Sequence, residues 1–442
     1  MRIIGNNPAA DNAEITAVAS GTLANGNTVI VNADGTVSVI EGTAQALGSS
    51  AVFEPANALY ISTTFDSSSN KVVIAYSDGG NSGYGTAVVG TVSGTSISFG
   101  TPAVFNTTLT YDISTTFDSS SNKVVIVYGI NSGWGYAIVG TVSGTNISFG
   151  TAAVFESGPI SYVSATFDSN SNKVVIVFRN QFIYGVAIVG TVSGTSISFG
   201  TAVVYKSSQA DWNNAVFDSN SNKVVVAYAD GANSKFATAI VGTVSGTSIS
   251  FGSAVVFESA DSDFLTMVFD SNLNKVVVFY SDQLNSKYGT VAVGTVSGTT
   301  ISFGTPVVFE EAQVDGLAPS FDTNANNIVL FYTDKGNSSY GTYIIGVVSG
   351  TTINFETPVV FVAATTSSHS STFDSNASTV VNTYNSSSVG NGIVFQNAST
   401  TLTAENFIGF ANGAAADGGT ARVQIGSGIN GAQSSLTAGQ QY

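Results

Sequence analysis

The chain has 442 residues and carries 12 basic and 28 acidic side chains, which gives a formal net charge of −16. So acidic a chain is a poor partner for nucleic-acid phosphates, and the absence of cysteine excludes disulfides, thiol catalysis and cysteine-bound zinc. Apolar residues make up 43% of the sequence and occur in runs of about six, so we expect a folded core and no membrane insertion. Residues 1–14 lack the apolar stretch of a secretory signal.

The first 42 residues do not match the rest of the chain and contain a predicted β-hairpin. Residues 26–40, GNTVIVNADGTVSVI, place two β-rich runs on either side of a turn at residues 32–35. We therefore expect an N-terminal β segment over residues 1–42.

Residues 43–397 repeat one pattern seven times. A first strand ends at a Phe-Asp pair, and a turn such as SNSN leads to a second strand such as KVVIVY. A variable loop leads to a third strand such as GTAVVGTV, and the turn SGT leads to a fourth such as SISFGTPAVF. The Phe-Asp pairs recur at intervals of 50 or 52 residues, at Phe65-Asp66, Phe117-Asp118, Phe167-Asp168, Phe217-Asp218, Phe269-Asp270, Phe321-Asp322 and Phe373-Asp374.

Four antiparallel strands in about 50 residues predict one blade of a β-propeller. A solenoid would repeat in shorter coils, and sandwich domains would repeat at about 100 residues. The second strand is apolar at nearly every position, as expected between neighbouring blades, whereas the first is rich in Ser, Thr and Ala, as expected beside a central axis. The sequence therefore predicts an all-β fold with a seven-bladed β-propeller of four-stranded blades.

The two ends of the repeat array complement each other. The segment ALGSSAVFE, Ala46 to Glu54, matches the fourth strand SFGTPAVFN of the first full copy, although no complete copy precedes it. The seventh copy lacks its own SISFGT strand. We expect the N-terminal strand to complete the last blade and so remove two exposed edges.

The C-terminal residues 398–442 also fall outside the repeat. They contain two further strand-like runs, NFIGFANG and GTARVQIGSG, and end at Gln441-Tyr442 in what looks like the start of another strand. We expect this C-terminal β module to form a small β domain with residues 1–42, and the natural product to be longer or to be cleaved there.

These segments resemble known proteins. The pieces FIGF, GGTARVQIGSGI and SSLTAGQQY resemble a module that recurs in virion structural and tail-fibre proteins of bacteriophages, especially marine phages. The N-terminal SGTLANGNTVIVNADGTVSVI and the repeats FDSNSNKVVIVY and VGTVSGTSISFG resemble segments of the same proteins. The resemblance covers most of the chain and implies a place in the virion, but no catalytic motif comes with it.

The repeated DSNSNK segment has oxygen-bearing side chains at alternating positions, as calcium loops do. It lacks the glycine and the distal glutamate of such loops, so we expect an Asp-stabilised hairpin turn and no cofactor, with calcium as the alternative. The lysine that follows is expected to pair with the aspartate of the same hairpin, as in Lys71 with Asp66.

Few catalytic constellations are possible. His369 is the single histidine, no GxSxG motif is present, and the three arginines (Arg2, Arg179 and Arg422) are too scattered for a sialidase-type cluster. Six acidic residues could supply the two carboxylates of a glycosidase, but their spacing in the sequence does not single out one pair. We therefore expect these residues to form a solvated acidic rim, and we expect no enzyme. The candidates are Asp211, Asp261, Asp263, Glu310, Glu311 and Asp315.

The loops that differ between copies share one predicted face, formed by the second-to-third-strand loops and the connections between blades. One group of aromatic residues precedes Phe-Asp by five or six positions and either packs between blades or binds a ligand: Tyr60, Tyr111, Tyr162, Trp212 and Phe264. A second group is expected to pack between blades: Tyr84, Trp134, Tyr184, Phe236, Tyr288 and Tyr340. Together with Asp211 and Asp263, the first group forms the predicted ligand-binding site, with Trp212 at its centre beside the amides of Asn213 and Asn214.

The sequence thus favours a non-enzymatic phage virion protein, on a tail fibre or the capsid surface and assembled in the host cytoplasm. Its expected partners are other virion proteins, a homo-oligomer formed through the terminal β domain, and a host surface glycan. The alternative is an extracellular adhesin or surface-filament subunit of a marine bacterium, and a glycan hydrolase ranks third.

Overall fold

The computed structural model describes residues 13–31, 35–39, 44–131, 133–398 and 407–425. Within them it consists of antiparallel β-strands and two short 3-10 turns, η1 (Gly79–Asn81) and η2 (Gly231–Asn233), with no α-helix. The predicted all-β class is confirmed. None of the described residues belongs to a helix long and apolar enough to cross a membrane. The chain divides into two compact parts, residues 46–396 and the two ends, 1–45 with 397–442.

The two ends of the chain share a five-stranded antiparallel sheet in the order β1-β35-β34-β2-β3. Its strands are β1 (Ala13–Val18), β2 (Thr28–Val31), β3 (Val37–Val39), β34 (Phe407–Ala411) and β35 (Thr420–Ile425). Leu23, Val29 and Val423 are fully buried in its core. β2 and β3 pair as the predicted hairpin, although its turn at residues 32–34 lies outside the described residues, as do residues 426–442 with the SSLTAGQQY segment.

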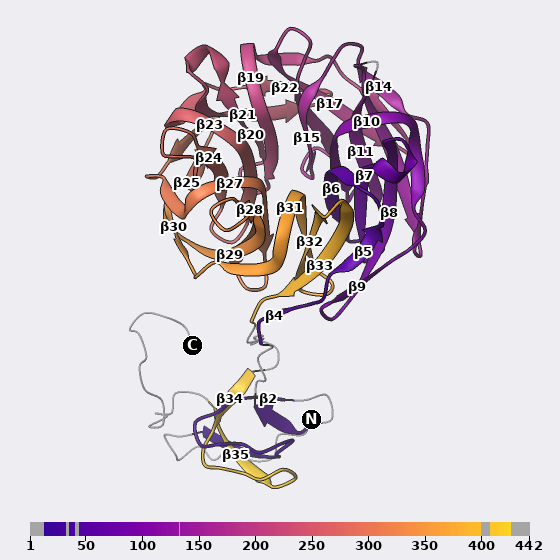
Figure 1. The fold of residues 1–442 in the computed structure, drawn as a ribbon. Coiled ribbons are helices and arrows are strands. Elements are labelled where there is room, and N and C mark those ends of the chain that lie inside the picture. The colour runs from indigo at the N-terminus through magenta and orange to yellow at the C-terminus, as the bar shows by residue number, and fades with distance from the viewer. Residues whose placement is uncertain (1–12, 32–34, 40–43, 132, 399–406, 426–442) are drawn as a thin grey trace. The chain divides into compact units, whose positions relative to one another are not determined.

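In each repeat of residues 46–396 four antiparallel strand positions pair in chain order, and the fourth is split into two segments that both pair with the third strand. Figure 1 shows the repeats side by side. Repeat 1 comprises β6 (Ala58–Asp66), β7 (Lys71–Asp78), β8 (Tyr84–Ser93), β9 (Ser96–Phe99) and the start of β10 (Ala103–Asp118). Repeat 2 comprises the end of β10, β11 (Lys123–Ile130), β12 (Gly135–Ser143), β13 (Asn146–Phe149) and β14 (Ala153–Glu156). Repeat 3 comprises β15 (Ser161–Asp168), β16 (Lys173–Arg179), β17 (Tyr184–Ser193), β18 (Ser196–Phe199) and the start of β19 (Val203–Asp218).

The remaining repeats follow the same plan. One long strand joins neighbouring repeats except at the joints of repeats 2 with 3 and 7 with 1, where two separate strands take its place. Repeat 4 comprises the end of β19, β20 (Lys223–Asp230), β21 (Phe236–Ser245), β22 (Ser248–Phe251) and the start of β23 (Val255–Asp270). Repeat 5 comprises the end of β23, β24 (Lys275–Asp282), β25 (Tyr288–Ser297), β26 (Thr300–Phe303) and the start of β27 (Val307–Asp322). Repeat 6 comprises the end of β27, β28 (Asn327–Asp334), β29 (Tyr340–Ser349), β30 (Thr352–Phe355) and the start of β31 (Val359–Asp374). Repeat 7 comprises the end of β31, β32 (Thr379–Ser386), β33 (Val389–Gln396), β4 (Ala46–Leu47) and β5 (Ala51–Glu54).

The second strands carry the core because both of their faces are covered by neighbouring sheets. In β7 the five residues from Val72 to Tyr76 are fully buried, as their unbroken apolar run predicts. Side chains from successive repeats mix in each core cluster, for example Val127 of repeat 2 with Phe178 of repeat 3. Burial of this apolar surface between sheets therefore holds the repeats together.

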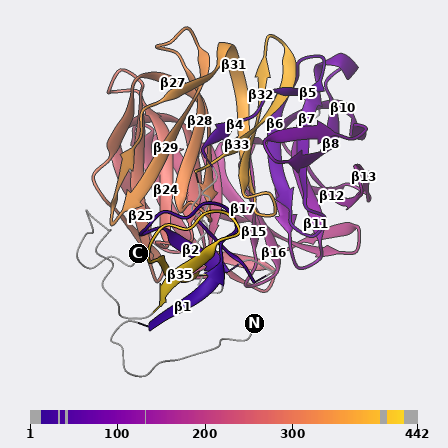
Figure 2. The same cartoon turned by 90° about the horizontal axis from the view of Figure 1, so that it is seen from below.

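The first strands follow one another around a circle. Each contacts the first strand of the next repeat, and β31 of repeat 7 contacts β6 of repeat 1. Figure 1 shows the first strands following one another around the circle, and in Figure 2 β31 again lies near β6. The segment Ala46–Glu54 pairs with β33, so that Phe395 lies opposite Leu47 and Asn391 lies opposite Val52. A strand from the N-terminal side thus supplies the fourth position that the sequence of repeat 7 lacks.

The turn after each Phe-Asp pair is the predicted Asp-stabilised hairpin turn. In repeat 1 the Oδ1 atom of Asp66 accepts the backbone N–H groups of Ser68 and Ser69, and Asn70 takes a left-handed backbone with φ 54°. The expected ion pair with the following lysine is wrong, because none of the ion pairs among the described residues joins Lys71 to Asp66 or its counterparts. The aspartate is committed to the turn backbone instead.

A close backbone approach joins the outer strands of neighbouring repeats. At Gly100 a Cβ atom would overlap the backbone carbonyl oxygen of Thr145, which lies in the SGT turn of the next repeat. The same overlap would occur at Gly48, Gly150, Gly200, Gly252 and Gly304, each with the corresponding threonine. The equivalent position of repeat 6 is Glu356, which is exposed, because repeat 7 has no SGT turn to approach it.

Candidate functional site

Every first strand contains a β-bulge near its start, where the register with the second strand shifts. One residue in each bulge has a left-handed backbone, with φ between 47° and 57°: Tyr60, Asp112, Tyr162, Trp212, Phe264, Gly316 and Ser368. The left-handed region suits Gly, Asn and Asp, whereas a bulky aromatic residue there is strained. Four of the seven bulges nevertheless hold an aromatic residue.

Three of the predicted aromatic residues form one continuous row across repeats 3, 4 and 5. The ring of Trp212 lies 4.9 Å from that of Tyr162 and 4.6 Å from that of Phe264, both in tilted contact. All three side chains are half-buried, and those of Trp212 and Phe264 pack against the cores beneath them. The structure therefore brings Tyr162, Trp212 and Phe264 together, and we call them the aromatic row.

Charged side chains contact two of the three aromatic residues of the row, Trp212 and Tyr162. The indole Nε1 of Trp212 donates a hydrogen bond of 2.8 Å to Oδ1 of Asp263. The guanidinium of Arg179 lies over the Tyr162 ring, 4.8 Å from its centroid, and forms an ion pair with Asp211. Sequence reasoning used Arg179 only to exclude a sialidase site. The signal in the sequence was a charged residue at this position near the end of the second strand, where the other six repeats have an uncharged one: Ser77, Gly129, Ala229, Ser281, Thr333 and Asn385.

Asp211 and the two amides beside Trp212 are already committed to the fold. Asp211 is buried, and its oxygens accept from Arg179 and from Gln209. Asn213 accepts from Tyr205 and donates to the carbonyl of Ala210, while Asn214 accepts the backbone N–H of Met267. Both polar atoms of Asn213 and the oxygen of Asn214 are thus used within and between strands, and the expectation that these amides flank a ligand stays a prediction.

Tyr60 and Tyr111 form a separate pair at the joint of repeats 1 and 2, with their rings 6.5 Å apart. Tyr60 occupies its bulge and is 47% exposed, but Tyr111 precedes the bulge, which in repeat 2 is held by Asp112. Burial raises the pKa of Asp112 to about 6, although a backbone hydrogen bond from Tyr162 and the charge of Arg179 oppose the shift. The five predicted aromatic residues thus fall into two groups.

The second group of aromatic residues does not pack between sheets as uniformly as predicted. Trp134 is 41% exposed and stacks on Tyr136 at 6.4 Å, so the prediction is wrong for this residue. Tyr184 packs against a core shared by repeats 2 and 3, in agreement with the prediction. Tyr84, Phe236, Tyr288 and Tyr340 are half-buried at the starts of third strands.

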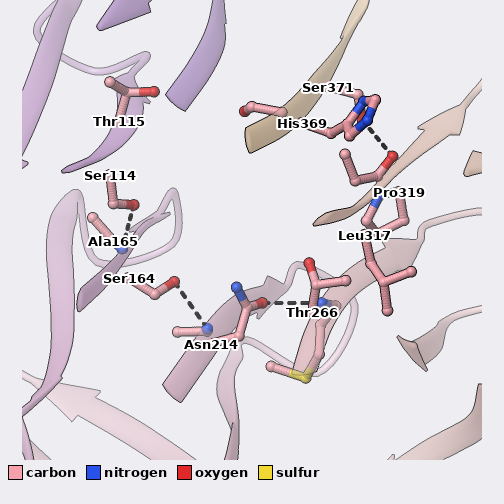
Figure 3. A pocket seen from close by; sticks show the side chains of 14 residues that line it. Ser114, Thr115, Ser164, Ala165, Asn214, Thr266, Leu317, Pro319, His369 and Ser371 are labelled. Atoms are coloured by element: carbon pink, nitrogen blue, oxygen red, sulfur yellow. Dashed lines mark hydrogen bonds between the residues drawn. The ribbon is translucent and has the colours of Figure 1, made fainter. Parts of the chain in front are cut away.

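A polar cavity of about 250 Å³ lies between the first strands, just beyond the bulges (Figure 3). Hydroxyl and amide side chains line much of it, but several are committed: Ser114 accepts the backbone N–H of Ala165, and Ser164 accepts that of Ala215. A second cavity of about 490 Å³ is lined by the Phe residues of five Phe-Asp pairs. Neither lining contains a charged side chain.

His369 borders the polar cavity, where contacts with neighbouring side chains hold its ring. Its Nε2 atom lies 3.0 Å from the Thr366 hydroxyl, and its ring stacks on Tyr384. Burial lowers its pKa to about 3, although a hydrogen bond with Asn382 opposes the shift, so the imidazole is neutral at pH 7. Gly316 leaves room for this ring, since a Cβ there would lie 3.1 Å from its Cδ2 atom.

The other acidic candidates are dispersed among structural contacts. Glu310 accepts from the hydroxyl of Tyr332, Asp315 pairs with Lys335 at 2.9 Å, and Asp261 lies 4.0 Å from Lys235. Within the described part of the chain no three His, Asp or Glu side chains cluster as metal ligands. The aromatic row and its carboxylates are therefore the arrangement best suited to contact a ligand.

No protein-family model matches the chain, and no curated protein matches it significantly. Among solved structures it is similar to the BP39L lectin of Burkholderia pseudomallei, with a TM-score of 0.54 and 11% identity over 79% of this chain and 100% of the lectin. It is also similar to a protein of unknown function from Dyadobacter fermentans, with a TM-score of 0.51 and 10% identity over 80% of this chain and 99% of that one. At these identities the likeness concerns the fold alone.

Proposed function

We propose that residues 46–396 form a seven-bladed β-propeller and that the protein binds carbohydrate without catalysing a reaction. The circular contacts of the first strands and the pairing of Ala46–Glu54 with β33 support the propeller. The likeness in fold to a lectin supports the binding role. The aromatic row is the proposed binding site.

The observation that carries the proposal is the left-handed backbone of Tyr162, Trp212 and Phe264. A non-glycine residue in this region costs about 1–3 kcal/mol, and such strain concentrates at functional sites. The same bulge accepts Gly316 and Ser368 in repeats 6 and 7, so the fold does not require an aromatic side chain there. Three adjacent aromatic residues at strained positions are explained by a ligand that uses their faces, and sugar rings pack their C–H groups against such faces.

The two tryptophans of the chain provide a direct test. In Trp134→Phe the remaining Trp212 reports on the row, and in Trp212→Phe the remaining Trp134 reports on the segment before β12, outside the row. We expect at least one member of a library of neutral and charged oligosaccharides to change the fluorescence of the first variant, and none to change that of the second. A library without any binder, or a signal that follows Trp134, overturns the proposal.

A substitution separates binding from packing. Trp212→Ser places in repeat 4 the residue that repeat 7 carries at the same bulge. We expect it to abolish glycan binding and to keep a single unfolding transition, with Trp134→Ser as the matched control that retains binding. If Trp212→Ser unfolds the protein, Trp212 is a core residue and the row is not the site.

We further propose that the protein is a virion protein of a phage, on a tail fibre or the capsid surface, and that the glycan belongs to the host. The support is the resemblance of FIGF and of the repeats to marine phage proteins. Mass spectrometry of purified virions tests this, and detection on a bacterial surface instead would favour the adhesin. Release of reducing sugar from a bound polysaccharide, lost on Asp263→Asn, would favour a hydrolase.

A further inference from the structure

The aromatic row lies in an excess of negative charge. Burial raises the pKa of the Tyr162 hydroxyl, the charges of Asp211, Asp112 and Asp263 raise it further, and Arg179 alone opposes them. At the other end of the row Asp261 is close to Asp263 and Asp211, with Lys235 as the opposing cation. Four carboxylates and two cations therefore surround the row.

The protein itself shows how a cation sits on this row. The guanidinium of Arg179 lies 4.8 Å from the centroid of the Tyr162 ring and is held by the carboxylate of Asp211. An aromatic face and a carboxylate together attract a cation through the ring quadrupole and the full negative charge. The joint of repeats 3 and 4 is thus an occupied cation site whose cation is a side chain.

The next joint repeats this combination without a cation. Asp263 is the counterpart of Asp211 one repeat later, and its Oδ1 atom accepts the Trp212 N–H. In the described residues no ion pair uses Asp263, although it is only half-buried. Trp212, Phe264 and Asp263 therefore offer aromatic faces and one unneutralised carboxylate at the same place.

We propose that this joint binds the ammonium group of an amino sugar, so that the preferred glycan carries free amines. This inference rests on the proposed function and specifies its ligand class. The ammonium lies against the row beside Asp263, as the Arg179 guanidinium lies beside Asp211. An anionic sugar such as a uronic acid is repelled by the excess carboxylates, and an N-acetylated sugar lacks the charge that Asp263 recognises.

The test compares three ligand sets of equal length: oligosaccharides of glucosamine, their N-acetylated counterparts, and oligogalacturonate. Calorimetric titration is carried out on the full chain at a pH where the amine is protonated. We expect glucosamine oligomers to bind at least tenfold more tightly than the N-acetylated ones, and high salt to reduce this preference. Oligogalacturonate should not bind.

Asp263→Asn keeps an acceptor for the Trp212 N–H and removes the charge, so it should abolish the preference while the fold is retained. Asp315→Asn is the control, because Asp315 holds the same place one repeat later, but its charge is paired with Lys335 and Gly316 follows it in place of an aromatic residue. Equal binding of amine and N-acetyl forms overturns this inference and leaves the proposed function standing. Tighter binding of the uronate also overturns it. Failure of every glycan to bind overturns both.

Discussion

The hydroxyl of Ser370 accepts the backbone N–H of Thr63 at 2.9 Å and so joins the last repeat to the first across 307 positions of sequence. The same contact joins successive repeats elsewhere, as when Ser62 accepts the N–H of Thr115. First strands have no strand partner on their inner side, and these hydroxyls satisfy N–H groups that would otherwise be left unpaired there. The joint between the chain's distant ends is therefore chemically equivalent to the joints within it.

The first prediction concerns the hydrogen bond between Ser370 and Thr63 that joins repeats 7 and 1. Ser370→Ala leaves the N–H of the buried Thr63 without a partner and should lower the free energy of unfolding by about 1–3 kcal/mol. Ser114→Ala, which affects an internal joint, should have a similar effect. Denaturant unfolding measures both. A null effect of Ser370→Ala beside a clear effect of Ser114→Ala would mean that repeats 7 and 1 are not joined in solution.

Removal of residues 1–54 tests the closing strand. The truncation deletes β4 and β5, exposes the edge of β33 and removes Phe53 from the core that repeats 7 and 1 share. We expect loss of the cooperative unfolding transition or aggregation, measured by calorimetry and light scattering. A truncated protein with an unchanged melting curve would contradict the proposed closure.

The close approach at Gly100 gives a matched pair of substitutions. Gly100→Ala places a methyl group on the carbonyl oxygen of Thr145 and should destabilise the protein by about 3 kcal/mol or more. Glu356→Ala introduces the same residue at the equivalent, exposed position of repeat 6, where the change should stay within about 0.5 kcal/mol. Equal melting temperatures for the two variants would refute the contact.

Asp112 should make stability depend on pH. Burial raises its pKa from 3.8 to about 6, so the folded state favours the protonated acid. Its contribution to stability is fully present below about pH 4 and is lost as the pH rises through about 6. Asp112→Asn keeps an oxygen for the Tyr162 N–H and should therefore raise the melting temperature at pH 8 but not at pH 4. A variant with the wild-type profile at both pH values would show that Asp112 is not buried as described.

The repeat of the sequence allowed the strands to be predicted, whereas the types of residue in the first strands did not indicate where the β-bulges lie. The Phe-Asp repeat located the seven copies, and the likeness of ALGSSAVFE to SFGTPAVFN predicted the pairing partner of β33. The left-handed residues escaped notice because aromatic side chains are the least expected ones there. Aligning on aromatic type therefore selected Tyr111, whereas the backbone places Asp112 at the bulge.

Polar residues near Trp212 were predicted to face a ligand because composition cannot tell a committed side chain from a free one. Asp211 and Asn214 are bound by groups from other strands, 32 and 53 positions away in sequence. Such partners depend on the stacking of repeats, which no local pattern encodes. The free charge of Asp263 could not be predicted either, because it depends on Ala229 standing where the preceding repeat has Arg179, and on no other ion pair among the described residues reaching Asp263.

The contact between a glycine and the threonine carbonyl of the following repeat also determines which repeats can be neighbours in the chain. Repeats 1 to 5 carry both halves of this contact, so a gene duplication among them yields a copy that fits its neighbours on both sides. Repeat 6 carries the threonine but has Glu356 in place of the glycine, so it fits only before a repeat without the SGT turn. Growth or shrinkage of the array during evolution is thereby confined to its first five members, while the closing pair is inherited as one piece.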